Sequence, residues 1–172
     1  MINPFKKSYS KEEINTFRFL SRIKLFSLLS NDELSEFVPI LYPRKYKKDE
    51  VIFFRDDPSQ ALYIVKRGEV ILNIDINNRF EKLVEVKPGQ AFGDNTLLTN
   101  TKRLYTAVTS SDSATIYVIP QVNIQDIFSG NDKIKAKMLT SLAELYNHYT
   151  GNLFKAYKSS FGFFDIAEAY RS

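Results

Sequence analysis

Short apolar segments alternate with turn sequences at regular spacing through the middle of this 172-residue chain. The strand-like segments span residues 51–54, 62–65, 70–76, 83–86, 104–109 and 114–119. The turn sequences between them include Asp56-Asp57-Pro58-Ser59, Asn77-Asn78, Pro88-Gly89 and Ser110-Ser111-Asp112-Ser113. Strands this short, separated by turns this often, are typical of a small roll or sandwich. We therefore predict a mainly β fold of the α+β class, a β-roll or jelly-roll barrel of about eight short strands.

Segments with helical periodicity flank these strands on both sides. Before them, Ser10 with Glu13 has the spacing of a capping box, and Ser30 provides a second N-cap signal. Apolar residues at positions 34, 37, 38 and 41 then predict a helix that Pro43 ends. We divide the chain into an N-terminal helical segment (1–24), a β-roll (25–128) and C-terminal helices (129–172).

The C-terminal helical region carries a narrow apolar stripe. Its members recur at steps of three and four residues: Ile134, Met138, Leu142, Leu145, Tyr149 and Leu153. Such a stripe packs either on its own β-roll or against a second copy, and the second arrangement predicts a homodimer through this helix. Gly151 predicts a bend. The apolar tail 161–167 could cover the pocket, pack on a partner chain or complete the core, and we expect one of the last two.

Charge and residue usage exclude several classes of function. The net charge of +4 is too small for the basic face of a nucleic-acid binder, so the cluster 44–48 is expected to be a solvated loop before a strand. The chain has no cysteine and one histidine, His148, which argues against zinc or iron sites, cupin-like metal chemistry and catalytic triads. Because neither a signal peptide nor a membrane-spanning window is visible, we expect a cytoplasmic protein that does not bind membranes.

The stretch from Pro88 to Ala107 combines the groups that a small sugar phosphate requires. It contains a glycine turn, the acid Asp94, a short segment with free backbone N–H groups and the arginine Arg103. N–H groups and a guanidinium suit a phosphate, and a carboxylate suits a sugar hydroxyl. This combination indicates a sensor of a ribose with a cyclic phosphate.

Several short motifs, taken together, are more specific than any one of them. They are Leu25-Phe26 with Leu29, Val51-Ile52-Phe53, Leu62-Tyr63-Ile64-Val65 before Gly68-Glu69-Val70, Pro88-Gly89, Phe92-Gly93-Asp94, Leu97-Leu98, and Arg103 with Thr106. In this order, and between helices, they resemble the cyclic nucleotide-binding domain. That family includes the sensory half of catabolite-activator-type regulators, and it recurs in kinase regulatory subunits and gated channels. The resemblance covers roughly residues 25–128.

The resemblance implies a phosphate-binding cassette over residues 92–106. Gly93 would allow a close approach of the backbone, Asp94 would bind the ribose 2′-hydroxyl, and Arg103 would pair with the phosphate. The N–H groups of Asn95 and Thr96 would face that phosphate. The implied ligand-binding residues are Leu72, Leu83 and Val84, against which the base would lie, and Phe92, Gly93, Asp94, Asn95, Thr96, Arg103, Leu104 and Thr106.

This chain departs from the family pattern at the site itself. Asp94 stands where the family has glutamate, and Leu104 where it has a small or hydroxyl residue. Asn95 and Thr96 replace residues that are more often small and apolar. Asp49 and Asp56 stand where turn glycines are usual, and aspartate tolerates left-handed turns. The fold should therefore survive more easily than the site does.

Two functions follow. The first is a stand-alone, non-enzymatic regulatory module that binds cAMP or cGMP and signals through its helices to a protein partner. The alternative is a degenerate cyclic nucleotide-binding fold that acts as a ligand-free interaction or dimerisation module. Too few residues follow Lys155 for a winged helix-turn-helix domain, so we expect no DNA binding.

Overall fold

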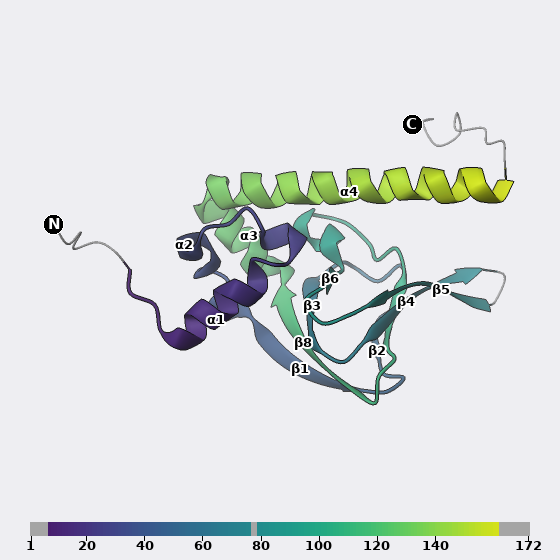
Figure 1. Cartoon of the computed structure of the whole chain (residues 1–172), viewed down its shortest axis with the longest axis horizontal. Helices are drawn as coiled ribbons and strands as arrows, with labels where there is room; N and C mark the ends of the chain where they lie inside the picture. Colours follow the sequence, from purple (N-terminus) through teal and green to yellow (C-terminus); the bar gives the residue numbers. More distant parts are fainter. Residues whose placement is uncertain (1–6, 77–78, 162–172) are drawn as a thin grey trace.

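Two four-stranded antiparallel sheets pack against each other beneath a long C-terminal helix (Figure 1). This computed structural model describes residues 7–76 and 79–161. The strands are β1 (Tyr42–Lys47), β2 (Val51–Phe53), β3 (Ala61–Arg67), β4 (Val70–Ile76), β5 (Arg79–Val86), β6 (Ala91–Phe92), β7 (Thr106–Thr109) and β8 (Ser113–Pro120). One sheet has the order β1-β8-β3-β6 and the other β2-β7-β4-β5. The predicted jelly-roll fold is confirmed, but the described strands form two open sheets and no closed barrel.

Most of the shorter helical elements lie at one end of the sheets, next to the beginning of α4 (Figure 1). They are α1 (Lys11–Leu20), η1 (Lys24–Phe26), α2 (Asn31–Leu34), η2 (Val38–Ile40), η3 (Asp94–Leu97), α3 (Gln121–Gly130) and α4 (Asp132–Phe161), where η marks a 3₁₀ turn. Although α4 has 30 residues, neither it nor any other helix in residues 7–76 and 79–161 has the apolar length that a membrane crossing needs.

Both N-terminal caps form as the sequence predicts, but the second helix is short. The Ser10 hydroxyl accepts the Glu13 N–H at 3.1 Å, and the Ser30 hydroxyl accepts the Glu33 N–H at 3.3 Å. Each glutamate returns a bond to the backbone of its serine. The prediction that this helix continues to residue 41 was wrong, because α2 ends at Leu34 and the 3₁₀ turn η2 follows. Pro39 lies in that turn, and proline disfavours an α-helix by clashing with the carbonyl four residues before it.

The basic cluster at residues 44–48 occupies an edge strand, which corrects the expectation of a loop. Strand β1 pairs with β8 along its whole length, from Tyr42 opposite Val118 to Lys47 opposite Ser113. Pro43 lies inside this strand and not at a helix end. Most side chains of β1 are exposed, and positive charges on an edge strand oppose pairing with another chain.

Tight turns between the strands use aspartate where a left-handed backbone is required. Asp49 has φ of 63° and Asp56 has φ of 68°. In this region aspartate is tolerated better than most residues, so these turns form without glycine. The β4–β5 hairpin pairs Leu72 with Val84, and its expected turn at 77–78 lies outside the described residues.

The apolar stripe of α4 divides into two parts with different environments. Ile134, Met138 and Leu142 are buried in a core shared with the N-terminal helices. Tyr149 and Leu153, further along, are 51% and 66% exposed. The first half of the stripe therefore packs on its own chain. Figure 1 shows α4 running without a break, so the bend expected at Gly151 is absent.

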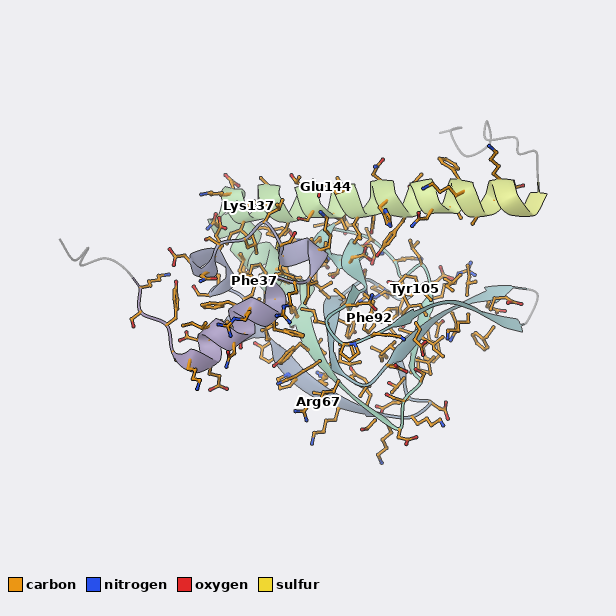
Figure 2. The ribbon with its side chains drawn as sticks, viewed as in Figure 1. Phe37, Arg67, Phe92, Tyr105, Lys137 and Glu144 are labelled. Atoms are coloured by element: carbon orange, nitrogen blue, oxygen red, sulfur yellow. The ribbon has the colours of Figure 1, made fainter. Side chains whose placement is uncertain are left out.

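Two ion pairs connect α4 to the N-terminal helices. Lys137 Nζ lies 2.6 Å from Glu33 Oε2, and Lys24 Nζ lies 2.5 Å from Glu144 Oε2. Figure 2 shows Lys137 and Glu144 on α4, above these helices. Glu33 is buried, which alone would raise its pKa, but the hydrogen bonds from Lys137 and the Ser30 N–H hold the pKa below its usual value. The Glu33–Lys137 pair therefore stabilises the contact between α2 and α4.

Lys137→Met should lower the free energy of unfolding by about 1–2 kcal/mol, because Glu33 would keep its charge in a buried place without its cation. Urea unfolding at neutral pH measures this loss. Lys135→Met is the matched control, since Lys135 is exposed on the same helix and should change little. Equal effects of the two substitutions would show that the ion pair adds no stability.

Candidate functional site

A pocket of about 850 Å³ lies between the β4–β5 hairpin, the segment around η3 and the helix α4. Strand residues form one apolar wall, and α4 residues form the opposite wall. The strand side consists of Leu72, Leu83, Val84 and Val86, and the helix side of Leu145, Tyr146, Tyr149, Asn152, Leu153 and Ala156. A pocket of this size, largely apolar with a few polar groups, is typical of sites for small organic ligands.

The structure brings seven of the eleven expected ligand-binding residues to this pocket. These seven are Leu72, Leu83, Val84, Phe92, Asp94, Asn95 and Leu104. The other four, which do not line it, are Gly93, Thr96, Arg103 and Thr106. The pocket therefore contains the expected base wall and the expected acid, while the arginine lies behind it.

Gly93 occupies a position that only glycine fits. Its φ is +71°, in the left-handed region. A Cβ added there would come 2.5 Å from Arg103 Nη1 and 3.2 Å from the carbonyl oxygen of Ala61. The absence of a side chain thus lets the guanidinium of Arg103 lie directly against the backbone that begins η3.

Arg103 is buried, and its guanidinium binds backbone carbonyl groups. Nη2 donates to the oxygen of Ala61 at 2.7 Å, and Nη1 donates to the oxygen of Gly93 at 3.2 Å. Its Cζ atom lies 4.2 Å from the centroid of the Phe53 ring and 5.4 Å from that of Tyr63. Burial lowers the pKa of Arg103, and the nearby Tyr63 and Tyr105 oppose that shift. In this structure Arg103 therefore holds η3 to the start of β3, and its guanidinium does not face the pocket.

Asp94 places a carboxyl group with an open bonding position at the pocket. Its Oδ2 atom is buried and has no hydrogen-bond partner among the described residues. Burial raises the pKa of this carboxyl, and hydrogen bonding from the N–H groups of Asp94 and Asn95 opposes part of the rise. A ligand hydroxyl that donates to Oδ2 would relieve the cost of burying an unpaired acceptor.

The polar residues after Asp94 bond to the loop before β3. Asn95 accepts a hydrogen bond from the Ser59 hydroxyl at 2.8 Å and donates to the Lys102 carbonyl at 2.6 Å. The Thr96 hydroxyl donates to the Ser59 carbonyl at 3.1 Å. Asn95 and Thr96, which replace small apolar residues in the family pattern, are therefore explained by bonds inside the protein. The hydroxyl of Thr106, at the start of β7, also bonds inside the protein, because it accepts the Arg55 N–H at 3.0 Å.

Sequence reasoning missed the tyrosines of the pocket. Tyr146 and Tyr149 reach it from α4, and Tyr105 reaches it from the segment before β7. Burial raises the pKa of all three tyrosines, and the charge of Asp94 adds to each shift. The stripe of α4 already contained Tyr149, but its periodicity does not distinguish a pocket wall from a dimer seam. Among the described residues no cluster of histidine and acidic side chains could hold a metal ion.

Gly93→Ala should destabilise the protein more than Gly89→Ala does. Both glycines have positive φ, so both substitutions should cost about 1–2 kcal/mol of backbone strain. Only at Gly93 does the new Cβ meet other atoms, since nothing lies within 4 Å of one at Gly89. Thermal and urea unfolding of the two variants compare these costs. Equal losses would contradict the close approach of Arg103.

Asp94→Asn should make stability less dependent on pH. Folding raises the pKa of the Asp94 carboxyl above its ordinary value of 3.8. The contribution of this carboxyl to stability is therefore complete below pH 3.8 and is lost as the pH rises through the raised pKa. Relative to the variant, the wild type should therefore lose free energy of unfolding as the pH rises above about 4. Urea unfolding at several pH values gives the difference. A difference that is constant with pH would show that the carboxyl is not perturbed.

Comparison with known proteins identifies relatives of this arrangement. Residues 43–131, half of the chain, match the cyclic nucleotide-binding domain family. The cyclic AMP receptor protein of Thermus thermophilus is 30% identical over 90 residues, which cover 52% of this chain and 42% of that protein. The chain spans less than half the length of the curated relatives it matches.

Solved structures show the same fold at low sequence identity. The sensor domain of the transcriptional regulator DNR from Pseudomonas aeruginosa is 16% identical, with a TM-score of 0.68 over 84% of this chain and 95% of that one. The N-terminal domain of a Streptomyces coelicolor regulator is 20% identical, with a TM-score of 0.68 over 76% of this chain and 94% of that one. The regulatory domain of Toxoplasma gondii PKA, crystallised with cAMP, is 23% identical, with a TM-score of 0.63 over 70% of this chain and 46% of that one. With its fold and the matched residues 43–131, this chain belongs to the cyclic nucleotide-binding domain family.

Proposed function

We propose that this chain is a non-enzymatic regulatory module that binds a cyclic nucleotide, cAMP or cGMP, and signals through α4 to a protein partner. The observation that carries this proposal is the unpartnered, buried Oδ2 atom of Asp94 beside an apolar pocket. An acceptor of this kind suits a sugar hydroxyl, and the apolar walls suit the flat faces of a base. The cAMP held by the related regulatory domain of Toxoplasma gondii PKA supports the same ligand class.

The base would lie between the two walls of the pocket. Leu83 and Val84 on β5 are about half exposed, and across from them Tyr149 of α4 is also half exposed. Covering these surfaces with a base would remove apolar area from water, which contributes roughly 25 cal/mol per Å². Aromatic side chains such as Tyr146 and Tyr149 also stack on flat rings.

The phosphate would lie near the backbone that begins η3. Arg103 is directly behind this backbone, so its positive charge acts on an anion there even while the guanidinium binds Ala61 and Gly93. Arg22 and Lys24 also line the pocket, although Lys24 is paired with Glu144, and Glu85 and Asp94 are the acids of the lining. Arg103 and Arg22 are therefore the groups that would attract an anionic ligand.

Ligand binding would reach the rest of the protein through α4. This helix forms a pocket wall near Tyr149 and is buried in the helical core near Met138. A ligand shifts the position of α4 only if it binds one arrangement more tightly than the other. A homodimer contact or partner protein on the exposed half of the stripe would share Tyr149 and Leu153 with the pocket, so that contact and the ligand would affect each other.

A second function, that of a ligand-free interaction module, is favoured by one observation. The two Nη atoms of Arg103, which the resemblance assigns to the phosphate, already donate to two carbonyl groups, and only its buried Nε has no partner among the described residues. A fold that no longer binds a nucleotide would keep such an arginine for structural reasons alone. The two functions make opposite predictions for a titration.

Calorimetric titration with cAMP, cGMP and a cyclic dinucleotide decides between them. We expect saturable binding of one mononucleotide per chain, and about tenfold or greater weakening in Asp94→Ala, which removes a hydrogen bond to a charged group. Asp126→Ala, an exposed acid on α3, is the control and should bind normally. Absence of heat and of thermal stabilisation with every nucleotide would favour the ligand-free module.

A further inference from the structure

The hydroxyl of Tyr105 lies at the backbone of the site. It accepts a hydrogen bond from the N–H of Gly93 at 2.9 Å. Its ring packs against the buried cluster between the sheets, with its centroid 5.8 Å from that of Phe53. Figure 2 shows Tyr105 and Phe92 inside the layer of strands below α4. The ring therefore fixes the hydroxyl at Gly93, the residue directly before Asp94 of the pocket lining.

The other polar groups of this segment are also bonded from within the protein. The N–H of Thr96 donates to the oxygen of Gly93 at 3.1 Å. The N–H groups of Asp94 and Asn95 act on the Asp94 carboxyl and lower its pKa. With the bond from Gly93 to Tyr105, the N–H groups of Gly93 and Thr96 are both bonded inside the protein. These two backbone groups of the segment are thus not free for a ligand.

Tyr105 offers the same chemistry as the sugar hydroxyl of a nucleotide. A hydroxyl both accepts and donates one hydrogen bond, and Tyr105 accepts from Gly93, the residue directly before the acceptor Asp94. Both Tyr105 and Asp94 line the pocket. Leu104, between Arg103 and Tyr105, is 68% exposed. Successive side chains in this segment therefore point alternately into the protein and out of it. This alternation directs both Arg103 and Tyr105 under η3.

We propose that the Tyr105 hydroxyl is an internal occupant of the sugar end of the pocket, which a ligand hydroxyl must displace from the Gly93 N–H to reach the open Oδ2 position of Asp94. Tyr105 then limits the affinity of the site, and a cyclic nucleotide binds more weakly than its contacts alone would allow. This inference rests on the proposed function, since it concerns the affinity of the same pocket. It makes Tyr105 an affinity-determining residue, because a ligand must supply its own acceptor to replace the bond to Gly93.

Tyr105→Phe tests the inference, because it removes the hydroxyl and keeps the ring against Phe53. The Kd for the mononucleotide that the wild type binds should fall by about threefold to tenfold, the equivalent of one net hydrogen bond. Tyr117→Phe is the matched control, a half-buried tyrosine on β8 outside the pocket, and its Kd should equal that of the wild type. Thermal unfolding confirms that each variant is folded.

A second measurement needs no ligand. Hydrogen exchange of the Gly93 amide, followed by NMR, should speed up in Tyr105→Phe and stay unchanged in Tyr117→Phe. Unchanged exchange in Tyr105→Phe would overturn the inference, because the bond to Gly93 would then be absent in solution.

The binding results separate this inference from the proposed function. If the wild type binds and Tyr105→Phe binds equally or more weakly, the internal-occupant role is wrong while the proposed function stands. If neither protein binds any nucleotide, both are wrong, and the ligand-free module is favoured. Tighter binding by Tyr105→Phe, together with faster exchange at Gly93, supports the inference.

Discussion

The buried guanidinium of Arg103 is the contact on which the arrangement of the pocket depends. A cation inside a protein is costly unless hydrogen bonds and polarisable surfaces compensate it. Here two carbonyl oxygens, of Ala61 and Gly93, accept its hydrogen bonds, and the face of Phe53 lies 4.2 Å away. Such cation–π contacts are stronger when they are removed from water.

This one side chain connects elements that are distant in the sequence. Ala61 begins β3, Gly93 precedes η3, and Phe53 ends β2. Gly93 must lack a side chain so that the guanidinium fits, and its left-handed backbone sets the direction in which η3 starts. The position of Asp94 at the pocket follows from that direction. The acid of the site is therefore placed by an arginine that does not itself line the pocket.

The parts of the fold that could be predicted from sequence depend on local chemistry. The capping pairs Ser10–Glu13 and Ser30–Glu33 and the left-handed aspartates need only neighbouring residues. Strand β1 was not predicted, because an exposed edge strand carries basic side chains in place of an apolar alternation. The early end of α2 was missed although Pro39 is visible in the sequence, since apolar spacing alone continued past it.

The candidate site was predicted less completely, for reasons that are tertiary. The orientation of Arg103 depends on the Ala61 carbonyl, 42 residues away, and no local pattern contains that contact. Similarly, a single stripe on α4 packs into the helical core at Ile134 and forms a pocket wall at Tyr149, and periodicity is the same in both places. Tyr105 resembles an ordinary core aromatic until its hydroxyl is placed at Gly93. The role of the eleven expected residues in binding stays a prediction.

The uneven burial of α4 gives the helix the geometry of a lever. Its fixed part is the segment 134–142, where Ile134, Met138 and Leu142 are buried and Lys137 is bonded to Glu33. From Leu142 to Phe161 the helix extends about 28 Å, at 1.5 Å per residue. A rotation of about 10° at the fixed part would move the far end by about 5 Å on that length. A small rotation of α4 in the helical core would thus produce a much larger displacement of its C-terminal end near Phe161.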